Sequence, residues 1–186
     1  QLDEDPAKVP FFPSKIARWG DRKYLDKVPD GKLTVDDYYR LGNVNPDFSF
    51  GLRNTFSYRN FSLDIYIQGD YGNEIVNFNR IQLESFDGYQ NNSAVALERW
   101  TETNPTNEYP RANASPHGII MSDVWVEDGS YARLKQVIFS YNLPKELLSK
   151  IKISNLQLSL TGYNLYTLTR YSGYDPEVSI FGGSVF

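Results

Sequence analysis

The chain has 186 residues, no cysteine and one histidine; 15% of its residues are aromatic and its formal net charge is −4. The length is that of one domain, and the lack of cysteine excludes disulfides and thiolate metal sites. An acidic chain without a concentrated basic patch argues against nucleic acid as a partner. No apolar run is long enough for a transmembrane helix, which leaves transmembrane strands open.

The first segment, 1–45, is predicted to be a loop, because proline and glycine interrupt every periodic pattern. Within it, 26–37 has the length of a calcium-binding loop. The candidate calcium ligands are Asp26, Asp30, Lys32, Thr34 and Asp37. The fit is poor, because Val28 stands where a ligand oxygen is needed. A Pro-Asp-Gly turn with a solvated acidic rim is the alternative that we favour.

A long antiparallel hairpin is predicted over 46–71. Apolar and polar residues alternate from 47 to 58 and again from 61 to 71, which is typical of strands with one apolar face. Only Arg59 and Asn60 separate the two runs, and asparagine tolerates the positive φ that a two-residue turn needs. The apolar set is Phe48, Phe50, Leu52, Phe56, Tyr58, Phe61, Leu63, Ile65, Ile67 and Tyr71.

Aromatic residues bracket both strands of this hairpin. Phe48 and Tyr58 stand at the ends of the first apolar set, and Phe61 and Tyr71 at the ends of the second. At ~3.3 Å per residue and a tilt of roughly 40°, each strand rises about 25 Å, the height of the lipid-facing band of an outer-membrane barrel. A soluble β-sandwich also alternates in this way, but the matched aromatic spacing favours the membrane.

The connection 72–129 is too long to be structureless in a compact domain, which indicates a functional loop. A short helix is predicted at 93–100, with Ser93 as its N-cap. Aromatic rings among amide side chains are found where proteins bind sugars or peptides, and also where rings hold a long loop together. The candidate ligand-binding residues are Trp100, Tyr109, Arg111 and Trp125.

No catalytic constellation is visible in the sequence. The only histidine, His117, has no cysteine or carboxylate at ligand spacing and is predicted to be a loop residue. No serine or carboxylate pair stands in a recognisable catalytic setting, so the sequence predicts that the protein is not an enzyme.

A second hairpin is predicted over 130–168, with a short turn or helical turn starting at Pro144. Tyr131 lies on the apolar parity of its first strand, ten residues before Tyr141. Arg133 and Lys135 share this parity, and a lipid-facing charge at mid-bilayer costs a few kcal/mol. We therefore expect both near the outer rim or behind protein. The remainder, 170–186, is predicted to be a loop.

Short and long connections alternate along the chain. Bacterial barrels have short periplasmic turns and long extracellular loops. On that pattern, 59–60 and 144–151 are predicted to be periplasmic, and 1–45, 72–129 and 170–186 extracellular.

An ordered series of motifs covers most of the chain. They are the segment 20–37, GNVNPDF at 42–48, NTFSYRNF at 54–61, RWT at 99–101, PRA at 110–112, VEDGSYARLK at 126–135, YNLP at 141–144 and GYNLYTLTRYSGYDPE at 162–177. Together they closely resemble the C-terminal part of the SusC/RagA family of TonB-dependent outer-membrane transporters of Bacteroidetes-type bacteria.

The resemblance implies an all-β fold: antiparallel transmembrane strands from the C-terminal part of a 22-stranded barrel in the bacterial outer membrane, with long extracellular loops. Residues 1–186 would then be one portion of a single barrel domain. The expected partners are the remainder of the barrel and its plug, a SusD-like lipoprotein, TonB and outer-membrane lipid. The imported ligands would be glycans or peptides, with no cofactor beyond the calcium considered above.

Two departures from the family pattern are visible. The plug and the TonB-contacting segment are absent, and the closing strand that usually follows the Tyr-Asp-Pro-Glu region is absent too. Four strands leave two open edges in lipid, so we expect this chain to be part of a longer protein. The alternative function is a secreted or surface β-sandwich that binds carbohydrate.

Overall fold

The structure is a computed structural model that describes residues 5–13, 16–86, 91–112, 120–149 and 152–177. Residues that lie close together in space group the chain into two compact units. Gln1–Leu41 and Val76–Val126 form the first, called here the loop unit, and Gly42–Ile75 and Glu127–Phe186 form the second, the sheet unit. His117 and the tail after Glu177 lie outside the described residues.

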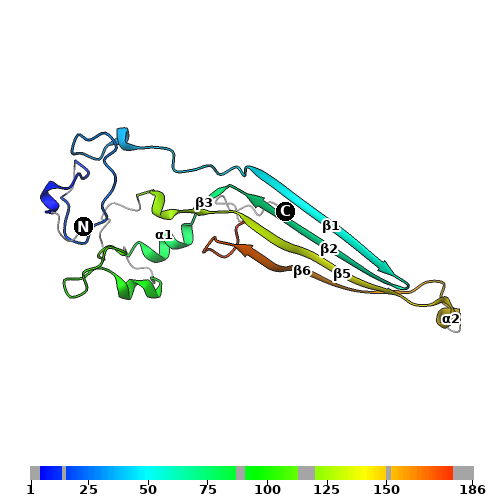
Figure 1. Cartoon of the computed structure of the whole chain (residues 1–186). Coiled ribbons are helices and arrows are strands. Elements are labelled where there is room, and N and C mark those ends of the chain that lie inside the picture. Colours follow the sequence, from blue (N-terminus) through cyan, green and yellow to red (C-terminus); the bar gives the residue numbers. More distant parts are fainter. Residues whose placement is uncertain (1–4, 14–15, 87–90, 113–119, 150–151, 178–186) are drawn as a thin grey trace. The chain divides into compact units, whose positions relative to one another are not determined.

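The sheet unit is built on one four-stranded antiparallel sheet in the order β1-β2-β5-β6 (Figure 1). The strands are β1 (Phe48–Tyr58), β2 (Phe61–Tyr71), β5 (Tyr131–Asn142) and β6 (Gln157–Thr169). The strands of both predicted hairpins are thus present. A helical turn, α2 (Lys145–Leu148), follows Pro144 in the connection between β5 and β6, as the proline predicted.

The connection between β2 and β5 contains several short elements. They are β3 (Glu74–Val76), which pairs with β4 (Val126–Asp128), then α1 (Phe78–Glu84), η3 (Ala94–Glu98) and η4 (Asp123–Trp125). The helix predicted at 93–100 is the 3-10 helix η3, with Ser93 in the N-cap position. The sequence did not predict α1, because its seven residues bury only Ile81 and leave no periodic stripe.

The remaining described elements are two further 3-10 helices at the start of the chain, η1 (Pro6–Lys8) and η2 (Val35–Asp37). No described helix has both the length and the apolar character needed to cross a membrane.

The first hairpin turns over Arg59 and Asn60, because Tyr58 is paired directly with Phe61. The positive φ falls on Arg59, at 53°, and not on Asn60 as expected. The Asn60 carbonyl instead accepts a hydrogen bond from the Asn142 N–H at 2.8 Å. That bond continues the ladder between β2 and β5 past the turn.

The register places the large apolar side chains on one face of the sheet, because directly opposed residues in antiparallel strands share a face. The opposed sets on this apolar face include Phe48 with Tyr71, Leu52 with Ile67, Leu134 and Tyr166, Ile65 with Val137, Leu63 with Phe56, Phe139 and Leu160, and Phe61 with Tyr58, Tyr141 and Leu158. Asn54, opposite Ile65, is the polar exception in β1. On the other face, the Arg53 Nε lies 3.0 Å from an Asp64 carboxylate oxygen.

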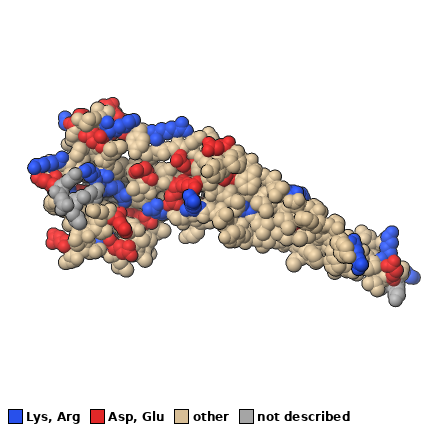
Figure 2. All heavy atoms as spheres, viewed as in Figure 1, with Lys and Arg blue, Asp and Glu red and all other residues tan. Residues whose placement is uncertain are grey.

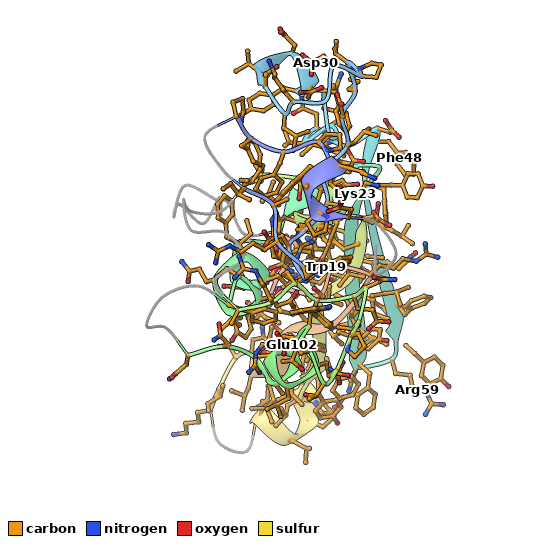
Figure 3. The ribbon with its side chains drawn as sticks, turned by 90° about the vertical axis from the view of Figure 1, so that its left-hand side faces the viewer. Trp19, Lys23, Asp30, Phe48, Arg59 and Glu102 are labelled. Atoms are coloured by element: carbon orange, nitrogen blue, oxygen red, sulfur yellow. The ribbon has the colours of Figure 1, made fainter. Side chains whose placement is uncertain are left out.

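Aromatic rings gather at both ends of the apolar face. Phe48 stacks on Tyr71 with ring centroids 5.3 Å apart, and at the other end Phe61 lies 4.6 Å from Tyr141. Figure 3 labels Phe48, the first residue of β1, and Arg59, the turn residue that directly follows this strand. The row at the Phe61 end therefore spans three strands, through Tyr58, Phe61 and Tyr141, and the row at the Phe48 end spans two, through Phe48 and Tyr71.

The apolar face is uncovered. Leu52 is 54% exposed and Leu160 75% exposed, and no second sheet of the described residues packs on the four strands. Figure 2 shows few charged side chains along the middle of the strands. The sandwich alternative is therefore wrong, because a sandwich needs a second sheet to bury this face.

A β-bulge at Lys135 changes which face the start of β5 presents. Leu134 pairs with Ile67 and Gln136 with Tyr66, so Lys135 has no partner in β2. The extra residue reverses the alternation and places Tyr131 and Arg133 on the polar face. The parity assigned to these two residues was thus wrong, whereas the expectation that Arg133 lies behind protein is confirmed by its exposure of 4%.

Replacing Ile65 by arginine would put a charge on the apolar face between the two aromatic rows. A lipid-facing charge at mid-bilayer costs about 2–4 kcal/mol, and we expect the unfolding free energy of the complete barrel in lipid vesicles to fall by that amount. The matched control is Gln136→Arg, at a neighbouring level on the polar face, where we expect little change. Equal losses in both variants would contradict the assignment of the apolar face to lipid.

Candidate functional site

The loop unit contains a cavity of about 250 Å³. Its walls come from residues between 6 and 23, from residues between 100 and 110, and from Val124. The lining residues that matter below are Arg18, Trp19, Arg22, Trp100, Glu108 and Tyr109. Figure 3 labels Trp19 and Lys23, which also lines the cavity. Aromatic, cationic and acidic side chains therefore meet in one hollow.

Gly20 fixes the position of the Trp100 ring. Its φ is +82°, and a Cβ atom at this position would lie 2.5 Å from two ring atoms of Trp100. The backbone N–H of Trp100 donates to the Tyr109 carbonyl at 3.2 Å, and the backbone N–H of Arg111 donates to the Gly20 carbonyl at 2.8 Å. Close packing on a glycine and two backbone hydrogen bonds thus hold the two main walls together.

Arg111 braces the same wall. Its Nε lies 2.7 Å from a carboxylate oxygen of Asp21, whose side chain is 6% exposed. The other oxygen of Asp21 accepts the Arg18 N–H at 2.9 Å. Arg111 is not among the lining residues, so in this structure its charge is directed to Asp21 rather than into the cavity.

Trp125 is packed in the interior of the loop unit, with 4% of its surface exposed. Its ring lies 5.1 Å from the Arg22 guanidinium and 5.9 Å from that of Arg80, and its Nε1 donates to the Ile120 carbonyl at 3.2 Å. Burial lowers the pKa of Arg22 from its usual value. Both cations lie within the range of a cation–π contact with this ring.

The structure thus brings two of the four candidate ligand-binding residues, Trp100 and Tyr109, to the cavity, and places Arg111 and Trp125 in its support. Ligand contact by these residues stays a prediction. Sequence reasoning missed Trp19, which lines the cavity and is 45% exposed. The feature that could have identified Trp19 is its place directly before the turn glycine Gly20, in a segment without periodicity.

The candidate calcium loop is organised by its own backbone. The Asp37 carboxylate accepts N–H groups of Lys27 and Val28 at 3.0 Å and of Thr34 at 2.7 Å. These hydrogen bonds, that from Thr34 first, lower the pKa of Asp37. Thr34 and Asp37 also form the capping box of η2.

The other candidate ligands have similar local roles. An Asp26 oxygen accepts the Gly31 N–H at 3.0 Å, and an Asp30 oxygen accepts the Lys32 N–H at 2.8 Å. Across the described part of the chain, no three acidic or histidine side chains cluster as metal ligands. The hydrogen bonds favour the turn, and calcium binding stays a prediction.

Replacing Asp37 by asparagine would remove one charged acceptor of three backbone N–H groups. We expect faster tryptic cleavage after Lys27 and Lys32 in the full-length protein, with no such change for Asp36→Asn, whose side chain is exposed. Because the folded-state pKa of Asp37 is lowered, its stabilisation is present above about pH 4 and is lost as the pH falls further. Equal cleavage of both variants would contradict this role.

Replacing Gly20 by alanine would strain the backbone and displace the Trp100 ring. Gly31 is the matched control, because its φ is +79° and a Cβ there would meet nothing within 4 Å. Both variants bear the cost of a positive φ, about 1–2 kcal/mol, and we expect Gly20→Ala to lose about 1–3 kcal/mol more. Thermal unfolding and tryptophan fluorescence of the full-length protein measure this difference, which is absent if the ring does not pack on Gly20.

Two curated proteins of Formosa agariphila are similar to most of this chain. The chain is 39% identical over 171 residues to TonB-dependent receptor P26, and the aligned region covers 88% of the chain and 17% of that protein. It is 34% identical over 160 residues to TonB-dependent receptor P3, and the aligned region covers 86% of the chain and 16% of that protein. The chain thus spans about a sixth of the length of these relatives. No protein-family model matches it.

Solved structures share the strand arrangement. The RagAB peptide transporter matches 73% of this chain and 15% of its own, with a TM-score of 0.65 and 28% identity. The RagAB peptide importer in the open-open state matches 85% of this chain and 18% of its own, with a TM-score of 0.68 and 27% identity. These relatives are named as receptors and transporters, in agreement with the prediction that the protein is not an enzyme. By sequence and by strand arrangement, this chain belongs with the TonB-dependent receptors, as a barrel segment of the SusC/RagA type.

Proposed function

We propose that the protein containing this chain imports nutrients across the bacterial outer membrane. In this proposal the sheet unit is part of the barrel wall, and the loop unit belongs to the extracellular surface that meets the ligand. The observation that carries it is the uncovered apolar face between two aromatic rows. Lipid is the surrounding in which such a face is stable.

The ligand in this proposal is a peptide or a glycan. The solved relatives are titled as a peptide transporter and importer, which supports the peptide. The cavity supports either class, because Trp19 and Tyr109 offer rings, and Arg18 and Glu108 offer charged groups. Rings with a few convergent polar groups are typical of ligand pockets.

The same proposal includes the partners that the family likeness implies. A SusD-like lipoprotein would cover the extracellular side, and TonB would supply energy through a segment outside this chain. The barrel strands that precede this chain and the plug would complete the channel. The exposed edges of β1 and β6 support this, because open strand edges in lipid leave backbone groups unpaired.

The experiment is deletion of the gene for the full-length protein, followed by growth on defined mixtures. Peptide digests and polysaccharide hydrolysates would be supplied one at a time as the limiting nutrient, with free amino acids and monosaccharides as controls. We expect growth to fail on one mixture and to persist on its free monomers. Unchanged growth on every mixture would contradict import as the function.

Replacing Trp19 by alanine would remove an exposed ring from the cavity wall. Tyr39→Ala is the matched control, because Tyr39 is 44% exposed against 45% for Trp19 and does not line the cavity. Loss of a ring contact costs about 0.5–1.5 kcal/mol, which raises the half-saturating nutrient concentration roughly two- to tenfold. Uptake of the labelled mixture measures this, and an equal effect of both variants would contradict a ligand role for the cavity.

A further inference from the structure

The bulge in β5 creates a cation site on the polar face of the sheet. Arg133 is opposed to Gln68 of β2 and Thr167 of β6, and it is 4% exposed. Its Nε donates to the Thr167 hydroxyl at 2.9 Å, and its guanidinium lies 5.5 Å from the centre of the Tyr131 ring. Its two other nitrogens, Nη1 and Nη2, bond to residues that follow β6 in the chain.

The segment after β6 returns over the sheet and occupies these two groups. The Arg133 Nη2 donates to an Asp175 oxygen at 2.6 Å, and its Nη1 donates to a Glu177 oxygen at 2.7 Å. Lys135 adds a second cation to the same Glu177 oxygen at 3.0 Å. A buried arginine thus receives two carboxylates, the arrangement that makes its burial tolerable.

Glu177 is held from three strand residues besides Arg133. Its second oxygen accepts the Tyr131 hydroxyl at 2.8 Å and the Gln68 amide at 2.6 Å. Its own N–H donates to Asp175 at 2.9 Å. Every hydrogen bond that the structure gives Asp175 and Glu177 therefore involves a side chain. Side-chain contacts, and not backbone pairing with a strand, attach this segment to the sheet.

The segment has a second fastening at its start. The N–H and hydroxyl of Ser172 donate to the two carboxylate oxygens of Glu127 at 2.8 and 2.9 Å. Between the two fastenings, Pro176 is buried and Tyr174 is 92% exposed. The chain is thus tied at two points with a side chain presented outward between them.

We propose that residues 171–177 form an ionic strap, fastened at Arg133, that lies across the polar face of the barrel wall and presents Tyr174. Arg133 acts as a positioning residue for the strap, and Glu177 is the group through which it acts. The strap does not depend on which nutrient is imported or on whether the barrel imports one.

The charges of Asp175 and Glu177 predict the pH range in which the strap stays bound to Arg133. Burial raises the pKa values of Asp175 and Glu177, but the hydrogen bonds and cations outweigh it, so both pKa values lie below their usual range. The groups that face them are Arg133, Lys135 and Tyr131 of β5, Gln68 of β2, and Asp70, which acts on Tyr131. Carboxylates with lowered pKa values stabilise the strap above about pH 4 and release it as the pH falls further.

The test is a nitroxide spin label at position 174 of the full-length barrel, introduced as Tyr174→Cys in a cysteine-free background. The Tyr174 side chain is 92% exposed, so the label rotates freely, and we expect the order of the strap backbone to set its spectrum at neutral pH. With Glu177→Gln and Asp175→Asn together, or below about pH 4, we expect a spectrum more mobile than that of the parent at neutral pH. The matched control is Asp64→Asn, which breaks an aspartate–arginine pair with Arg53 on the same face and leaves the strap intact.

Barrel unfolding in detergent separates release from misfolding. A mobile label in the double variant, with the unfolding midpoint near that of Asp64→Asn, supports the strap. A double variant with the same label mobility as the parent at neutral pH overturns it, and so does an equal gain in mobility in the Asp64→Asn control.

Discussion

Backbone hydrogen bonds between β1, β2, β5 and β6 hold four strands in a single register, and that register sorts the side chains. Leu63, Phe139 and Leu160 come level on one face, while Arg53 and Asp64 pair on the other. No packed layer is needed to produce this segregation, because alternation and register alone do so. The uncovered apolar face and the polar face that carries the charges both follow from it.

The uncovered face sets the environment that the sheet needs. Apolar surface in water costs roughly 25 cal/mol per Å², and a face this broad would drive aggregation in a soluble protein. Hydrocarbon removes that cost, and the rings of Phe48, Tyr71, Phe61 and Tyr141 stand where the two interfaces of a bilayer would lie. The likeness to RagAB agrees with this interpretation.

The loop unit is organised by a different kind of interaction. Its order rests on specific polar contacts: Asp21 with Arg111, Asp37 with three backbone N–H groups, and Trp125 with two guanidinium groups. Each contact depends on side chains that are distant in sequence or on a particular turn. An isolated residue in such a loop gives little indication of whether it supports the wall or faces the cavity.

The sequence by itself determined the four long strands, both hairpins and the aromatic ends of the first hairpin, because a period of two and a ten-residue spacing are local properties. The tertiary structure decided the rest. One unpaired residue, Lys135, reverses the parity of Tyr131 and Arg133, and a count of alternating residues cannot detect a bulge. The cavity beside Trp100 and the contacts of Glu177 join residues that are far apart in the chain, so only folding brings them together.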